Sequence, residues 1–258
     1  MTGSEVYSSS FYEGEGKSAE ESARAIVPLV LNLFSPRSVV DVGCGTGAFV
    51  REFIRNGVDD ARGIDGDWLI TGHHLVIPPS HFTSADIQSP IPTDRKYDLA
   101  LCLEVGEHLE SSRADTLVEE LCTLAPVVVF SAATPLQFGT NHVNERWPSY
   151  WAKKFRQNGY IASDCLRPQV FHLPQVASWY ATNMIAYIRG DNLSAFPPIV
   201  QQSAVQHVQF KVRNLKFPGY TSLANELPPP LRHMLYLTVR LTWGVVVDGG
   251  RSVTNDSV

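Results

Sequence analysis

Three glycines stand close together after an aspartate in the first quarter of the chain. Residues 38–53 read SVVDVGCGTGAFVREF, and Gly43, Gly45 and Gly47 fall between an apolar run and a run with helical spacing. Glycine has no Cβ, so a ligand can approach its backbone closely, and it adopts the left-handed dihedrals of a tight strand-to-helix turn. A helix that begins near Gly47 would also present free N–H groups. The stretch therefore predicts a turn that binds a small molecule.

The aspartate of this stretch discriminates between two kinds of ligand. Gly43, Gly45 and Ala48 also fit the G-x-G-x-x-A fingerprint of a dinucleotide-binding turn. Asp65, at the end of the next expected strand, would then hold a ribose hydroxyl. A carboxylate from Asp41 at the same sheet edge would repel a pyrophosphate and favour a cationic ligand. S-adenosylmethionine carries a sulfonium and an ammonium group, so we expect it here, with NAD as the alternative.

Alternating strands and helices would position these residues. Apolar, β-rich runs predict strands at 38–42, 61–65, 81–85, 97–103, 126–131, 160–165 and 182–189. Helical spacing predicts helices at 47–56, 112–124, 147–158 and 174–180. This alternation is typical of a parallel sheet covered by helices on both faces. We expect a doubly wound α/β domain over residues 21–190, between a flexible leader or lid at 1–20 and a C-terminal extension at 191–258.

Composition and charge narrow the classes of partner. The 258 residues are 44% hydrophobic and 18% charged, which is ordinary for a globular protein. The net charge is −5 and the chain has no block of Lys and Arg, so nucleic acid is not expected as a partner. No apolar stretch is long enough for a membrane span. We expect a cytoplasmic protein that acts on a small molecule, with residues 227–247 forming either a homodimer helix or the outer wall of the site.

Four motifs in order resemble those of the class I S-adenosylmethionine-dependent methyltransferases. They are VVDVGCGTGAF, ARGIDGDWL, TSADIQSP and YDLALCLEVGEHL. The run from LEVGEHL through FSAATPLQFGTNHVNERWPSYW to WYATN resembles a bacterial methyltransferase-domain subgroup associated with sugar and natural-product modification. The resemblance implies a Rossmann-like, doubly wound, mostly parallel sheet of seven strands in the order 3-2-1-4-5-7-6.

The resemblance also assigns residues to the cofactor, S-adenosyl-L-methionine, and its product S-adenosyl-L-homocysteine. Asp65, followed by Gly66, would accept hydrogen bonds from both ribose hydroxyls. Asp86 would bind the adenine amino group and Ile87 would pack on the ring, while Trp68 would either stack on adenine or pack in the core. The methionine portion would contact Asp41, Gly43, Cys44, Gly45, Gly47, Glu104 and Val105.

Polar residues after the fourth and fifth expected strands would face the acceptor, because ligands of open α/β sheets lie beyond the carboxyl ends of the strands. An alcohol or phenol acceptor gains from a base, and histidine is the usual one near neutral pH. His142 is the first candidate, oriented by Asn144 or Glu145. His108 is the second, four residues after Glu104. Glu145 itself is a third, weaker base.

We predict no metal site from the sequence. A Mg²⁺ site made of Glu107, His108, His142 and Glu145 is conceivable, since some natural-product methyltransferases use this ion, but the spacing does not demand it. The predicted function is O-methylation of a sugar or other natural-product scaffold. The alternatives are N- or C-methylation of a small molecule, an NAD-dependent oxidoreductase, and an S-adenosylmethionine-binding module without catalysis.

Overall fold

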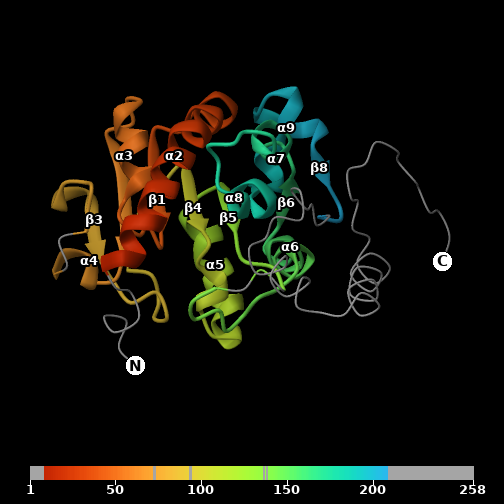
Figure 1. The fold of residues 1–258 in the computed structure, drawn as a ribbon. Coiled ribbons are helices and arrows are strands. Elements are labelled where there is room, and N and C mark those ends of the chain that lie inside the picture. The colour runs from red at the N-terminus through yellow and green to blue at the C-terminus, as the bar shows by residue number, and fades with distance from the viewer. Residues whose placement is uncertain (1–8, 72–73, 93–94, 136, 138, 209–258) are drawn as a thin grey trace, which may run out of the picture.

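A single mixed sheet forms the centre of the computed structural model, which describes residues 9–71, 74–92, 95–135, 137 and 139–208 (Figure 1). Within these residues the sheet has eight strands in the order β3-β2-β1-β4-β5-β7-β6-β8. The strands are β1 (Ser38–Val42), β2 (Asp60–Asp65), β3 (Phe82–Ser84), β4 (Leu99–Leu103), β5 (Val127–Ser131), β6 (Tyr160–Ser163), β7 (Ile185–Arg189) and β8 (Ala204–Val205). The first five pair in parallel, and β5–β7, β6–β7 and β6–β8 pair antiparallel.

The helices alternate with the strands along the chain. The α-helices are α2 (Ser9–Phe34), α3 (Ala48–Arg55), α4 (Trp68–Thr71), α5 (Ala114–Leu124), α6 (Pro148–Gln157), α7 (Arg167–Val170), α8 (Ser178–Asn183) and α9 (Pro198–Gln202). Four 3-10 helices lie between them: η1 (Pro79–His81), η2 (Gly106–His108), η3 (Ser111–Arg113) and η4 (Gly190–Ala195). The described helices include none long and apolar enough to cross a membrane.

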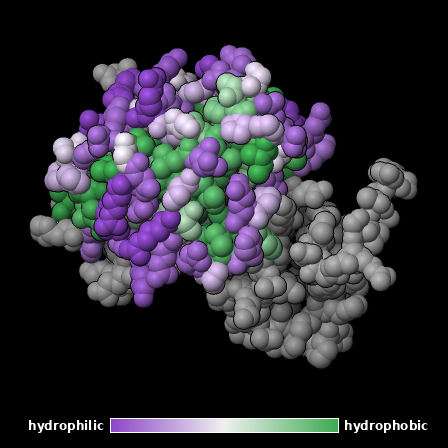
Figure 2. All heavy atoms as spheres, turned by 90° about the horizontal axis from the view of Figure 1, so that it is seen from above, coloured by the Kyte–Doolittle hydropathy of each residue, from purple (hydrophilic) through white to green (hydrophobic). Residues whose placement is uncertain are grey.

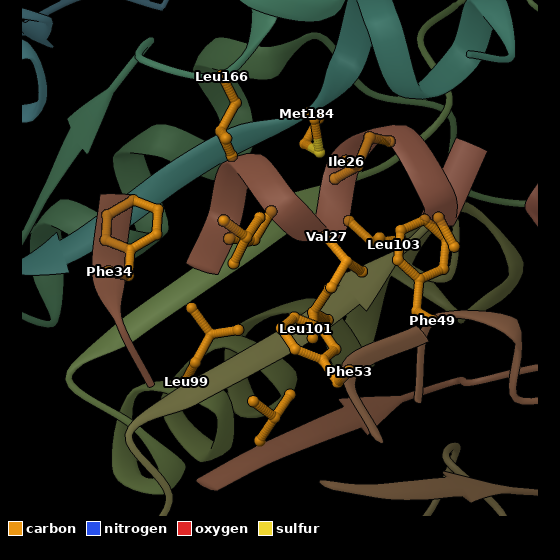
Figure 3. Close-up of a cluster of buried hydrophobic side chains, with 14 of the residues drawn as sticks. Ile26, Val27, Phe34, Phe49, Phe53, Leu99, Leu101, Leu103, Leu166 and Met184 are labelled. Atoms are coloured by element: carbon orange, nitrogen blue, oxygen red, sulfur yellow. The ribbon is translucent and has the colours of Figure 1, made fainter. Parts of the chain in front are cut away.

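Two hydrophobic cores lie on opposite faces of the sheet, because successive strand residues point to opposite sides. On one face, α2, α3, α7 and α8 cover the side chains of Leu99, Leu101 and Leu103. Figure 3 shows Ile26 and Val27 of α2 facing β4 across this core. On the other face, α5 and α6 cover Ala100 and Cys102 of the same strand. Hydrophobic side chains also reach the surface between hydrophilic ones when the molecule is viewed from above (Figure 2).

The expected fold class and the order of its seven strands are confirmed, with β8 as an addition at the edge of β6. The expected strand 182–189 begins too early, because Thr182 and Asn183 end α8 and Met184 donates its backbone N–H to the Tyr180 carbonyl at 3.2 Å. The expected helix 174–180 likewise begins only at Ser178. These differences leave the order of elements around the site unchanged.

The ends of the chain differ in part from the expected leader and extension. Residues 9–20 of the expected leader are the first turns of α2, while residues 1–8 lie outside the described residues. Past residue 190, η4, α9 and β8 follow, with Val200 and Val208 buried. Residues 209–258, including the apolar 227–247 stretch, lie outside the described residues. The lid role of 1–20 and the domain boundary at 190 stay predictions.

A long-range hydrogen bond ties α2 to the segment before α8. The Ser22 hydroxyl, which is fully buried, accepts a hydrogen bond from the Ala177 backbone N–H at 3.0 Å and donates one to the Ser18 carbonyl at 2.7 Å. Ala177 directly precedes α8, whose last residue, Asn183, lies at the site described below. Helix α2 therefore supports the segment that leads to Asn183.

Candidate active site

The glycine turn connects the end of β1 to the start of α3, as the sequence predicts. Gly43, Gly45 and Gly47 have φ angles of 77°, 53° and 89°, in the left-handed region that favours glycine. A Cβ on Gly43 would lie 2.3 Å from a Val105 methyl carbon, whereas one on Gly45 would meet nothing within 4 Å. Gly43 therefore permits close packing against the residue that follows β4, and Gly45 leaves open space beside the turn.

Asp65 lies directly beside this turn, at the end of β2. Its two carboxylate oxygens accept hydrogen bonds from the Gly45 N–H at 2.8 Å and the Gly66 N–H at 2.7 Å. Burial raises the pKa of Asp65, and these two N–H groups oppose the shift. A Cβ on Gly66 would lie 1.9 Å from a Trp68 ring carbon, so the indole packs over this backbone. Each carboxylate oxygen keeps a second lone pair, which a ribose hydroxyl could use.

The predicted adenine residues lie in the loop after β3. Asp86 is exposed and accepts a hydrogen bond from the Gln88 N–H at 3.0 Å, whereas Ile87 is buried. Arg113, which the sequence reasoning missed, donates to the Ile87 and Ser89 carbonyls, both at 3.1 Å. The guanidinium therefore fixes the loop that presents Asp86.

A salt bridge completes this support of the loop. Glu120 of α5 accepts from Arg113 at 2.6 Å and from the Ile91 N–H at 3.0 Å. Arg113 stands in an ordinary helix-start sequence, and no motif marks its contacts with residues more than twenty positions away. Its role as a positioning residue becomes visible only in the folded chain.

Asp41 lies inside the sheet between β2 and β4, opposite Gly63 and Leu101. Its exposed fraction is 2%, and burial, together with the negative charge of Asp65, raises the pKa of Asp41 to about 7. The folded chain therefore disfavours the ionised form of this carboxyl group. A cationic group bound beside it would favour that form again.

Glu104 follows β4 and is held by residues from two other segments. The Gln137 and Asn183 side-chain amides donate to its carboxylate at 3.2 and 3.3 Å, and Asn183 also donates to Gln137 at 2.9 Å. Its φ of 56° is uncommon for a residue other than glycine, and such strained residues cluster at functional sites. Burial raises the pKa of Glu104 against the hydrogen bonds it accepts. The sequence analysis singled out neither Gln137 nor Asn183.

Three acceptor-side residues come together beyond Glu104, and we refer to Glu107, His108 and His142 as the acceptor cluster. One carboxylate oxygen of Glu107 and one ring nitrogen of each histidine all lie within 4.8 Å of one another. The two imidazole rings are 4.9 Å apart at their centroids and nearly perpendicular, at 83°. The cluster unites the turn η2 with a loop more than thirty residues later in the chain.

Backbone and side-chain contacts fix this loop against η2. The Val143 and Asn144 N–H groups both donate to the Glu107 carbonyl at 2.9 Å, and the Asn144 side chain donates to the Gly106 carbonyl at 3.3 Å. His142 Nδ1 lies 2.9 Å from a Glu145 oxygen. Of the two residues expected to orient His142, Glu145 therefore contacts its ring, while Asn144 anchors the loop.

Burial strongly perturbs the acceptor cluster. The exposed fraction of Glu107 is 1%, and burial, with the nearby Glu104 charge, raises the pKa of Glu107 well above its usual value. The Glu107 and Ala133 N–H groups oppose this shift, but neither they nor any other group in the described residues reaches hydrogen-bond geometry with the Glu107 oxygens. Burial and the neighbouring His142 lower the pKa of His108 to about 4, so His108 is neutral at pH 7.

An aromatic residue of α6 packs beside the acceptor cluster. Trp151 is buried against Phe130, with ring centroids 4.9 Å apart, and a Cβ on Gly106 would lie 2.8 Å from its ring. The indole therefore packs against η2, which carries two residues of the acceptor cluster.

Residues 16–181 match a family model described as a methyltransferase domain. No curated protein matches the sequence.

Several solved structures are similar. DesVI of Streptomyces venezuelae is 23% identical, with a TM-score of 0.43 over 54% of this chain and 61% of DesVI. The sugar N-methyltransferase KedS8 of Streptoalloteichus sp. is 16% identical, with a TM-score of 0.52 over 69% of this chain and 91% of KedS8. An O-methyltransferase family protein of Burkholderia thailandensis is 13% identical, with a TM-score of 0.50 over 69% and 59% of the two chains. The chain thus spans less than two thirds of DesVI and of the Burkholderia protein. The likeness to KedS8 and to the Burkholderia protein shows the fold.

The first prediction concerns the close contact at Gly43. Gly43→Ala should weaken binding of S-adenosylhomocysteine at least tenfold, because the new methyl group would displace Val105 and the turn. Gly57→Ala is the matched control: Gly57 has a φ of 90° with open space around it, so it carries similar backbone strain away from the turn. Calorimetric titration and thermal unfolding of both variants separate affinity from stability. Equal affinities for Gly43→Ala and the unchanged protein would contradict the role of the turn.

The second prediction concerns pH. Between pH 5.5 and 7 the affinity for S-adenosylmethionine should rise by up to about tenfold per pH unit, because the cation favours ionised Asp41. The unliganded protein should lose stability from Asp41 as pH rises from 4 to 7, since the unfolded chain releases this proton near 3.8 and the folded chain only near 7.

Calorimetry at pH 6 in two buffers of different ionisation enthalpy measures the protons released on binding. Asp41→Asn should abolish the part of that release due to Asp41. Proton release that is identical in the variant would show that another group responds to the cofactor.

Proposed function

The chain belongs to the methyltransferase-domain family and is an S-adenosylmethionine-dependent methyltransferase, and on this premise we propose that it methylates an oxygen of a small molecule. The favoured acceptor is a hydroxyl group of a sugar or another natural-product scaffold. A sugar N-methyltransferase and an O-methyltransferase family protein share the fold, so this fold is compatible with nitrogen and with oxygen as the acceptor atom. The acceptor cluster favours oxygen, because it offers groups that can accept the proton of a hydroxyl or stabilise the negative charge that develops on its oxygen.

The cofactor would lie along the edge where the parallel strands end. Asp65 would bind the ribose, while Asp86 and Ile87 would hold the adenine. The methionine portion would contact Asp41, the Gly43–Gly47 turn, Glu104 and Val105. Support for this placement comes from the contacts between neighbours: Gly45 binds Asp65, and Gly43 packs against Val105. The family match favours this cofactor over the dinucleotide that the glycine spacing also allowed.

The acceptor would lie between the cofactor's methyl group and the acceptor cluster. Methyl transfer is an in-line displacement, in which the acceptor oxygen bonds to carbon as the carbon–sulfur bond breaks, so alignment and exclusion of water contribute most of the rate. The hydroxyl proton must also leave. The single observation that carries the proposal is the pair of His142 and Glu145, 2.9 Å apart, beside Glu107 and His108. A histidine held by a carboxylate is suited to assist that loss.

The third prediction tests this function. Purified protein with S-adenosylmethionine and a panel of free and nucleotide-linked sugars and phenols should form S-adenosylhomocysteine and a methylated product, identified by mass spectrometry. His142→Ala should lower turnover about 100-fold or more, while the dissociation constant of S-adenosylhomocysteine changes only a few-fold. His207→Ala is the control, because His207 is exposed and follows β8 at the far edge of the sheet.

Two outcomes would contradict this assignment at different levels. Unchanged turnover of His142→Ala would remove His142 from the reaction. Folded protein that binds neither S-adenosylmethionine nor S-adenosylhomocysteine in calorimetry would contradict the whole proposal.

A further inference from the structure

We propose that Glu107, His108 and His142 bind a divalent transition-metal cation such as Mn²⁺, in a site that stays open toward the acceptor. The sequence spacing alone did not predict such a site, because His142 follows Glu107 by 35 positions. The folded chain brings one potential ligand atom from each of the three residues within 4.8 Å of the others. Bonds of about 2.1 Å to a shared cation place three ligand atoms about 3.0 to 3.6 Å apart, so the side chains would move together by roughly 1 to 2 Å at most to complete the geometry.

The state of Glu107 points independently to a positive partner. Its carboxylate is 1% exposed, and no hydrogen bond within the described residues reaches either oxygen. A buried carboxylate without hydrogen bonds is costly, and Glu104 adds a second negative charge nearby. No described Lys or Arg side chain forms an ion pair with Glu107. A cation coordinated at this position would satisfy the charge and the oxygens together.

His142 has the arrangement that is usual for a metal ligand. A ligating imidazole usually donates its other ring N–H to a carboxylate, which fixes its tautomer and orientation. His142 Nδ1 is already placed against Glu145 at 2.9 Å, which leaves Nε2 to bind a cation. The Val143 and Asn144 N–H groups bind the carbonyl of Glu107 itself, so the two ligand-bearing segments are fixed to each other.

The kind of ligand selects the kind of cation. Two imidazole nitrogens and one carboxylate suit Mn²⁺, Co²⁺ or Zn²⁺, whereas Mg²⁺ and Ca²⁺ prefer oxygen ligands throughout. Three protein ligands leave further positions for water or for the acceptor oxygen, as in catalytic sites. We therefore expect Mn²⁺ to bind more tightly than Mg²⁺.

The role of this cation rests on the proposed function. Bound to the acceptor hydroxyl, it would lower the pKa of that hydroxyl, and the proton would pass to water. The oxygen lone pair then forms the new O–C bond, and the electrons of the C–S bond return to sulfur, which loses its positive charge. His142 would in this case act as a ligand and not as the base that the sequence analysis favoured.

The fourth prediction tests the site with Mn²⁺ itself. Full-length protein treated with EDTA and desalted should bind one Mn²⁺ per chain, measured by the loss of the free-ion signal in electron paramagnetic resonance. Glu107→Gln and His142→Ala should each weaken Mn²⁺ binding at least tenfold. Glu145→Gln, which alters the carboxylate beside the ring of His142, should weaken it about 10- to 100-fold. Glu110→Gln is the matched control, because Glu110 is an exposed carboxylate three residues after Glu107.

A cooperative thermal unfolding transition is the test of folding in every variant, and binding of S-adenosylhomocysteine is a separate test of the cofactor site. A chain that binds this product but no Mn²⁺ would overturn the metal site and leave the proposed function intact. Equal Mn²⁺ affinity for Glu107→Gln and Glu110→Gln would overturn it as well. A folded chain that takes up Mn²⁺ but not S-adenosylhomocysteine would contradict the proposed function instead. Turnover that falls with EDTA and returns with Mn²⁺ would support the catalytic role.

Discussion

The burial of four carboxyl groups close to one another is the constraint on which this site depends. Asp41, Asp65, Glu104 and Glu107 belong to strands or turns at one edge of the sheet, where the parallel strands end. Burial raises the pKa of all four, and Asp65 and Glu104 raise those of their respective neighbours Asp41 and Glu107. Each group can ionise fully only when a hydrogen-bond donor or a positive charge is close. The proposed cationic cofactor beside Asp41 and the proposed divalent cation at Glu107 would each supply such a positive charge.

The turn from Glu104 to His108 joins the two halves of the site. Val105 fills the space that a Cβ on Gly43 would need, so it contacts the cofactor turn. Two residues later, the Glu107 carbonyl holds the loop that carries His142. Trp151 packs against Gly106 between them. Five consecutive residues therefore set the distance between the proposed donor and acceptor sites, and Gly106 among them has no space for a side chain.

The sequence predicted local features of the site better than distant ones. The glycine turn, the placement of Asp65 and the pair of His142 and Glu145 each depend on short spacing or on a motif, and the structure reproduces their geometry. Arg113 and Asn183 act through contacts with residues more than twenty positions away, and no local pattern marks such contacts. The same reason explains why the proximity of Glu107 to His142 was not apparent. The assigned roles of the cofactor residues remain predictions.

The fold shows the same division between local and distant signals. Strand order followed from a family resemblance, whereas β8 has only two residues and no hydrophobic alternation to reveal it. The expected strand 182–189 began too early because Thr182 is a residue type that favours strands. In the folded chain its hydroxyl donates to the Ser178 carbonyl at 2.6 Å, which belongs to α8.

The partners of α2 have a consequence for synthesis on the ribosome. This helix comes first among the described elements, yet it packs on β4, β5 and β7 and binds Ala177 through Ser22. The apolar side chains on the buried face of α2 therefore stay exposed while more than a hundred further residues are translated. Nascent chains stalled before Ala177 would offer these side chains to chaperones, and the face of the sheet under α2 would close only after β7 has been translated.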